Sequence, residues 1–207
     1  MSLKKKIRAF LFDIESKNDE QRGKTISGRP IVYNSRTDLG WYDEIIADGA
    51  LDRADLKDVR LLVNHNVDMI PLARSRNNNE NSTMQLVVVP NAGLDFRADL
   101  DVENNADARA LGSAVDRGDI SGMSFMFTVS REEWDDVETD HPTRRILEIE
   151  KVFEISAVTF PAYAATSIEA RGLRDALESA RASLESERAK RAEIELRRKR
   201  IKLLTKI

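Results

Sequence analysis

The chain of 207 residues contains no cysteine, only two histidines and few aromatic residues (6%). The lack of cysteine excludes disulfides, thiolate zinc sites and cysteine nucleophiles. No apolar run approaches the roughly 18 residues that a membrane span needs. Residues 1–15 begin with lysines, but Asp13 and Glu15 interrupt the apolar patch before it is long enough for a secretory signal. These absences predict a cytoplasmic protein that does not enter the membrane.

Charge, by contrast, is abundant and unevenly distributed. Residues 171–207 contain 12 Lys and Arg against 6 Asp and Glu, so this segment carries +6, whereas residues 1–170 carry −9. The length suits one domain of about 150 residues with an appendage. The sequence therefore predicts an acidic domain over residues 1–170 and a basic C-terminal helix or arm over residues 171–207.

Most of the acidic domain is predicted to be β-structure. The apolar run 59–65 has the length of a buried strand, and residues 84–100 predict a hairpin that turns at the sequence PNAG. Two longer strands are expected at about 120–134 and 144–159, joined by a polar segment. Because many short strands leave edges that must be protected, we expect a compact β-barrel flanked by helices, a fold that is mainly β with some α.

Two helices are predicted. In residues 103–119, Ala106, Ala110, Leu111 and Ala114 recur at helical spacing, and Gly118 is placed to end the helix. No proline occurs from about 167 to 205, where apolar residues such as Leu184 stand among many charges. This segment predicts one long charged helix whose apolar stripe is too thin for a core element.

Two polar side chains stand in stretches that otherwise predict buried strands. His65 ends the run 59–65, and Ser124 lies between bulky apolar residues in GMSFMF. Each has an ordinary structural explanation: a histidine hydrogen-bonded to a loop, and a small residue tolerated in a strand near Gly122. Together they suggest a serine nucleophile with an imidazole base, because serine is a weak nucleophile unless a base lies beside it.

An orienting carboxylate is sought in the predicted hairpin. If strands 120–134 and 144–159 pair about a centre near position 139, position 124 faces position 154, and side chains facing each other lie about 5 Å apart. Glu154 stands in an apolar run, where a charge without a partner is costly. Glu148, nearer to the turn, and His141, in the turn, are the alternatives for the third member.

Other chemistries find less support. The chain has no GxSxG sequence, which argues against an α/β-hydrolase. His65 and His141 are its only imidazoles, and no HExxH sequence or carboxylate cluster at metal spacing accompanies them. We therefore expect neither a metal nor a cofactor.

Three sequence blocks carry a family resemblance. VNHN followed by MIPLARS, then SGMSFMF, then FEISAVTFPAYAATS resemble, in order and spacing, the prohead (capsid maturation) serine proteases of tailed bacteriophages. The resemblance covers about residues 25–172. It implies a fold similar to the herpesvirus assembly proteases (assemblins), which are β-barrels with surrounding helices. By position it implies His65 as general base, Ser124 as nucleophile and Glu154 as the acidic member.

The resemblance also implies a function and a setting. A protease of this kind, from a bacteriophage or prophage, would cut scaffold, the amino-terminal segment of the major capsid protein, and itself. It would act inside the assembling procapsid, in the host bacterial cytoplasm. Capsid protein and scaffold would be its partners, self-association is possible, and no membrane is involved.

Two alternatives from other classes remain open at this point. One is a catalytically inert capsid assembly or scaffolding protein. The other is a nucleic-acid-binding accessory protein acting through the basic residues 188–206. The second is less favoured, because this segment mixes glutamates with its basic residues and has no aromatic side chains for stacking on bases.

Overall fold

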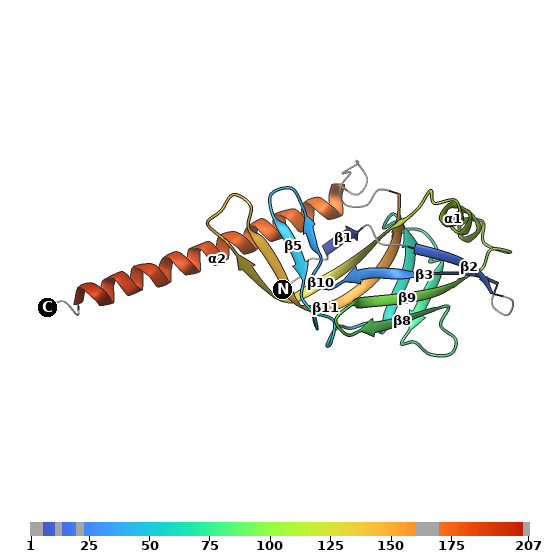
Figure 1. Cartoon of the computed structure of the whole chain (residues 1–207), viewed down its shortest axis with the longest axis horizontal. Helices are drawn as coiled ribbons and strands as arrows, with labels where there is room; N and C mark the ends of the chain where they lie inside the picture. Colours follow the sequence, from blue (N-terminus) through green and yellow to red (C-terminus); the bar gives the residue numbers. More distant parts are fainter. Residues whose placement is uncertain (1–5, 11–13, 20–22, 160–169, 205–207) are drawn as a thin grey trace.

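The computed structural model describes residues 6–10, 14–19, 23–159 and 170–204 of the chain. Within these ranges it contains two β-sheets and two helices (Figure 1). The larger sheet comprises β1 (Lys6–Phe10), β4 (Arg36–Asp38), β5 (Asp43–Ile46), β6 (Asp58–Val63), β7 (Ala73–Arg76), β10 (Gly122–Asp135) and β11 (Thr143–Val158). The smaller sheet comprises β2 (Ile14–Asp19), β3 (Gly23–Val32), β8 (Met84–Val89) and β9 (Gly93–Leu100).

Strand β11 is the organising element of the larger sheet. Along one edge it pairs with β10 in an antiparallel hairpin, which confirms the two long strands predicted near 120–134 and 144–159. Its other edge is shared by two short parallel strands: β5 pairs with residues 143–146 and β6 with residues 154–157. Segments distant in the sequence are thereby placed beside opposite ends of one strand.

The two sheets bury one common apolar core. Ile26, Leu94 and Phe96 of the smaller sheet belong to the same buried cluster as Phe125 and Ile155 of the larger sheet. Residues 122–128 of β10 are all buried, whichever face of the sheet their side chains point to. The continuous apolar character of GMSFMF therefore reflects a strand that is covered on both sides.

The predicted closed barrel is not found. The larger sheet runs β1-β10-β11-β5-β4, with β6 and β7 attached to β11, and the smaller runs β2-β3-β9-β8; among the described strands neither order returns to its start. The prediction assumed that short strands require closure. Instead the long strand β11 supports the short strands, and the sheets cover each other's apolar faces. The mainly β character and the C-terminal helix are confirmed.

Helix α1 (Ala106–Asp116) confirms the first predicted helix. The side chain of Asn105 caps its N-terminus by accepting hydrogen bonds from two backbone N–H groups, and Gly118 follows the helix at φ 75°. The buried face differs from the predicted one. Ala108, Leu111, Gly112 and Val115 are buried, because the sheet lies on that side of the helix, whereas Ala106 and Ala110 are exposed.

Helix α2 (Ala170–Leu204) confirms the long charged helix, but part of it packs closely against the body. Ala180 and Leu184 are buried in a second apolar cluster with Tyr42, Trp134 and Val137. The prediction that this stripe is too thin for a core was therefore wrong for the first half of the helix. The C-terminal half extends away from the sheets (Figure 1). In the described part of the chain, no helix is long and apolar enough to cross a membrane.

Gly93 yields a stability prediction, since it begins β9 in the hairpin that the PNAG sequence predicted. Its φ is 137°, and an added Cβ would lie 1.9 Å from the carbonyl oxygen of Ile31. We expect Gly93→Ala to lower the free energy of unfolding by about 3 kcal/mol or more, because it adds both backbone strain and a clash.

The matched control is Gly118→Ala. Gly118 also has a positive φ, of 75°, but no atom lies within 4 Å of the added Cβ. This substitution should cost only about 1 kcal/mol. Urea denaturation of the two variants measures the difference, and equal losses would contradict the close approach of β9 to β3.

Candidate active site

The loop after β6 holds His65 in an uncommon backbone conformation. Asn64 and His65 have φ of 49° and 54°, both in the left-handed region. Such a conformation is unfavourable for residues other than glycine, and it persists only where the surrounding structure enforces it. The turn directs the His65 side chain back over the sheet, where only 6% of its surface is exposed.

Asn64 provides part of that enforcement. Its side-chain amide donates to Thr159 Oγ1 at 3.1 Å, and its Oδ1 accepts from the Thr159 backbone N–H at 2.9 Å. The Asn64 backbone N–H also donates to the carbonyl of Ala157 at 3.0 Å. The residue therefore ties the end of β6 to the end of β11, immediately before the histidine.

His65 contacts a carboxylate on β11. Its Nδ1 lies 2.6 Å from Oε1 of Glu154, whose side chain is only 3% exposed. Ser156 Oγ donates a hydrogen bond to the other carboxylate oxygen, Glu154 Oε2, and accepts one from the His65 backbone N–H at 3.1 Å. Both carboxylate oxygens are thus paired, and a single hydroxyl links the carboxylate to the backbone of the histidine.

Ser124 lies on the neighbouring strand, on the same face. Its direct partner across the β10–β11 ladder is Ser156, whereas Glu154 pairs with Met126. The expectation that position 124 faces position 154 was therefore wrong by two residues. Near the turn the register agrees with a centre at 139, since Trp134 pairs with Arg144, but irregularities between Met126 and Glu132 shift it. Glu154 is consequently a diagonal neighbour of Ser124.

The hydrogen bonds of the imidazole indicate which nitrogen is available for chemistry. Because a carboxylate only accepts, His65 Nδ1 carries the proton in that bond, and in the neutral ring Nε2 presents its lone pair. His65 Nε2 is buried and has no hydrogen-bond partner among the described residues. A buried polar atom without a partner is uncommon, and an imidazole oriented in this way is what a general base requires.

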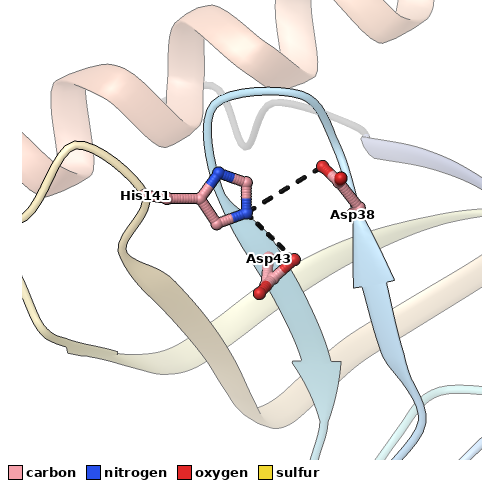
Figure 2. A group of neighbouring side chains, drawn as sticks. All are labelled: Asp38, Asp43 and His141. Atoms are coloured by element: carbon pink, nitrogen blue, oxygen red, sulfur yellow. Dashed lines mark ion pairs between the residues drawn. The ribbon is translucent and has the colours of Figure 1, made fainter.

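The two alternatives for the third member lie elsewhere. Glu148 is on β11 toward the turn, where it pairs with Arg131 rather than with the strand end beside His65. His141 is in the loop between β10 and β11, and its Nε2 lies 3.1 Å from Asp43 Oδ1 (Figure 2). The structure brings His65 to Glu154 and to neither alternative.

Access to the site is restricted in this conformation. Ser124 is fully buried, as is Ser156. A peptide carbonyl cannot reach a fully buried hydroxyl, so the groups covering Ser124 must move before any attack on a substrate. The arrangement otherwise contains the kinds of side chain that serine peptidases use: a hydroxyl on β10, a carboxylate on β11 and an imidazole in the loop after β6.

Comparison with known proteins defines the class further. A family model described as caudovirus prohead serine protease matches residues 12–179, so the chain belongs to that family. No curated protein and no solved structure matches the chain. The family predicted from the three sequence blocks is therefore confirmed. At the level of the family, this makes the chain a serine peptidase of phage capsid maturation. The similarity to assemblins stays a prediction.

The sequence predicted no role for Asn64 or Thr159, and it offered Ser156 only as a substitute nucleophile, not as a partner of Glu154. Ser156 was detectable in principle, because alternation along a strand places residues 154 and 156 on the same face. The Asn64–Thr159 contact had no such signal, since 95 positions separate the two residues. The FPAYAATS sequence, residues 160–167, lies outside the described residues.

Asn64 yields a prediction that tests the turn. Asn64→Ala removes the contacts with Thr159 and replaces asparagine, which tolerates a positive φ, by a residue that tolerates it less well. It should therefore destabilise the fold by about 2 kcal/mol. Asn64→Gly loses the same contacts but tolerates the backbone conformation, and it should cost about 1 kcal/mol less.

Thermal and urea unfolding of both variants provide the measurement. Glycine normally destabilises relative to alanine, so the reversed order is specific to a left-handed residue. If Asn64→Gly proved less stable than Asn64→Ala, the turn that places His65 would differ from the one described.

Proposed function

We propose that the protein is a serine endopeptidase of phage capsid maturation in which Ser124 is the nucleophile, His65 the general base and Glu154 the carboxylate that orients it. Membership of the family supports a prohead serine protease, and the roles of the individual residues are our inference. The observation that carries it is the 2.6 Å contact from Glu154 Oε1 to His65 Nδ1, together with the buried His65 Nε2 that has no partner among the described residues.

In this mechanism His65 Nε2 removes the proton from Ser124 Oγ as the hydroxyl attacks the scissile carbonyl, and the imidazolium then donates that proton to the leaving amine. Glu154 holds the Nδ1–H tautomer and stabilises the imidazolium while it exists. No described residue hydrogen-bonds His65 Nε2, so the Ser124 hydroxyl must come within reach when substrate binds. Catalytic hydrogen bonds commonly shorten in this way between the free enzyme and the substrate complex.

Ser156 acts in this mechanism as a positioning residue. It donates to Glu154 Oε2, so the carboxylate keeps Oε1 directed at the imidazole, and it accepts from the His65 backbone N–H. Its hydroxyl is therefore engaged in holding the pair together. The nucleophile is assigned to Ser124 on the neighbouring strand because Ser124 stands in the SGMSFMF block through which the chain resembles the family.

The substrates we propose are proteins of the procapsid: scaffold, the amino-terminal segment of the major capsid protein, and the protease itself. The enzyme would act inside the assembling procapsid in the host cytoplasm, as a prohead protease. From Ala192 to Leu204, beyond the hydrogen bonds of Arg188 and Arg191 to the body, helix α2 carries five Lys and Arg against two Glu, and it extends away from the sheets (Figure 1). We assign this basic arm, which follows the protease domain of residues 1–170, to contacts with acidic surfaces of these partners.

The central prediction concerns Ser124. Ser124→Ala should lower kcat/KM by roughly four to six orders of magnitude while the protein remains folded, because it removes one hydroxyl and opens little space. A fluorophosphonate probe, which reacts with activated serines, should label the wild-type protein on the peptide containing Ser124. Mass spectrometry of the labelled peptide identifies the residue.

Ser121→Ala and Ser156→Ala serve as controls. Ser121→Ala should retain labelling and activity. Ser156→Ala should keep the label on Ser124 while reducing the rate, because its role is to hold Glu154. Persistent cleavage by Ser124→Ala, or a label found on Ser156, would transfer the nucleophile to another serine.

A second functional prediction separates the two candidate carboxylates. Glu154→Gln should lower kcat by roughly a thousandfold or more with little change in KM, because the amide cannot stabilise the imidazolium and can favour the wrong tautomer. Glu148→Gln, a matched substitution on the same strand, should leave kcat within about twofold of wild type, since surface changes of this kind have small effects. Steady-state kinetics on a peptide substrate compare them, and an equal loss in both variants would remove the distinction.

A further inference from the structure

His141, the second histidine of the chain, lies in a cluster separate from the proposed catalytic site. Its Nε2 is 3.1 Å from Asp43 Oδ1 and 3.9 Å from Asp38 Oδ1, and the three side chains converge from three chain segments (Figure 2). One ligand atom from each residue lies within 4.8 Å of the other two. We propose that Asp38, Asp43 and His141 bind a divalent transition-metal ion such as Zn²⁺.

The backbone holds these three positions close together before any ion binds. Asp38, the last residue of β4, pairs with Asp43, the first residue of β5. The Asp43 backbone N–H donates to the carbonyl of Pro142 at 3.0 Å, which fixes the residue next to His141. Strand pairing therefore holds two of the three ligands, and a backbone hydrogen bond ties the loop that contains the third to Asp43. Such preorganisation favours binding.

The two carboxylates are also oriented by other groups. Asp38 Oδ1 accepts from the backbone N–H of Gly40 at 2.7 Å, and Asp43 Oδ2 accepts from Arg36 Nη1 at 2.7 Å. Hydrogen bonds of this kind fix ligating carboxylates in metal sites. Because Arg36 occupies Oδ2, Oδ1 of Asp43 faces the imidazole. Two carboxylates beside one guanidinium still leave a net negative charge, which attracts a dication.

Distances and exposure are compatible with a zinc-like ion. With metal–ligand bonds of about 2.0 to 2.2 Å, ligand atoms of a tetrahedral site lie roughly 3.4 Å apart. The 3.1 Å separation is close to this value, and the 3.9 Å separation needs a small movement of Asp38, whose side chain is 61% exposed. The His141 side chain is 42% exposed, so water can complete the coordination. One imidazole and two carboxylates, without thiolates, suit Zn²⁺, Co²⁺ or Ni²⁺.

The ion would connect the β4–β5 hairpin to the loop between β10 and β11. Helix α2 packs against that loop, since Arg188 donates to the backbone carbonyls of Val137 and Thr139. The metal would thus stabilise the surface on which α2 rests, at the opposite end of β11 from His65. Its role is structural, and the proposed peptidase chemistry does not pass through it.

The test is calorimetric titration of the untagged full chain with Zn²⁺ near pH 7, supported by the visible absorption of Co²⁺. We expect one saturable site in the wild type, weakened by roughly tenfold or more in His141→Ala and in Asp43→Asn, since each removes a ligand. His65→Ala is the matched control, because it removes the only other histidine, and it should bind as the wild type does. Circular dichroism checks that each variant is folded.

A second measurement keeps the proposal testable if a variant folds poorly. Zn²⁺ should raise the melting temperature of the wild type and of His65→Ala, because an ion that binds only the folded state stabilises it. The proposal is overturned if the wild type shows no saturation at millimolar Zn²⁺, if His141→Ala binds as tightly as the wild type, or if His65→Ala abolishes binding. In the first case the cluster is an ion pair between His141 and the two aspartates and nothing more.

Discussion

The pairing of β11 along both of its edges is the constraint on which the rest of the structure depends. On one edge the antiparallel strand β10 places Ser124 beside Ser156, and on the other the parallel strand β6 delivers His65 over Glu154. At the far end the same strand pairs with β5, which brings Asp43 next to the loop containing His141. Because a strand holds its neighbours about 4.8 Å away along its whole length, one element positions both clusters.

Each end of β11 also carries buried ionisable groups, and the two ends differ in how these are partnered. Arg144 is fully buried and pairs with Glu44 at 2.9 Å and with Glu132, so its permanent charge faces two carboxylates. Glu154 faces a histidine instead, whose imidazole, unlike a guanidinium, has one nitrogen that can accept a proton and another that can donate one. A buried charge is tolerated only when its partners are in place, so both arrangements reinforce the β10–β11 pairing. Only the second one can take part in proton transfer.

Local patterns predicted most of the individual elements. Helical spacing and Gly118 located α1, the PNAG sequence located the β8–β9 hairpin, and the absence of proline located α2. The predictions that failed concerned relations between elements. The bulges between Met126 and Glu132 shifted Ser124 from Glu154 to Ser156, and the sheet selected a different face of α1. Leu184 became a core residue because Trp134 and Tyr42, remote in the sequence, form an apolar surface against it. Closure of the sheet into a barrel likewise could not be decided from strand lengths.

The amino-acid sequence by itself determined the family, the mainly β character, the long charged helix and the candidate residues His65, Ser124 and Glu154, because motifs and local periodicity are properties of short segments. Only the tertiary structure decided that His65 meets Glu154 rather than Glu148 or His141, and that Asn64 and Ser156 hold this pair in place. It alone brought Asp38 and Asp43 to His141, across about a hundred positions of the chain. The physical reason is that such contacts depend on the pairing and register of distant strands, which packing of the whole core selects.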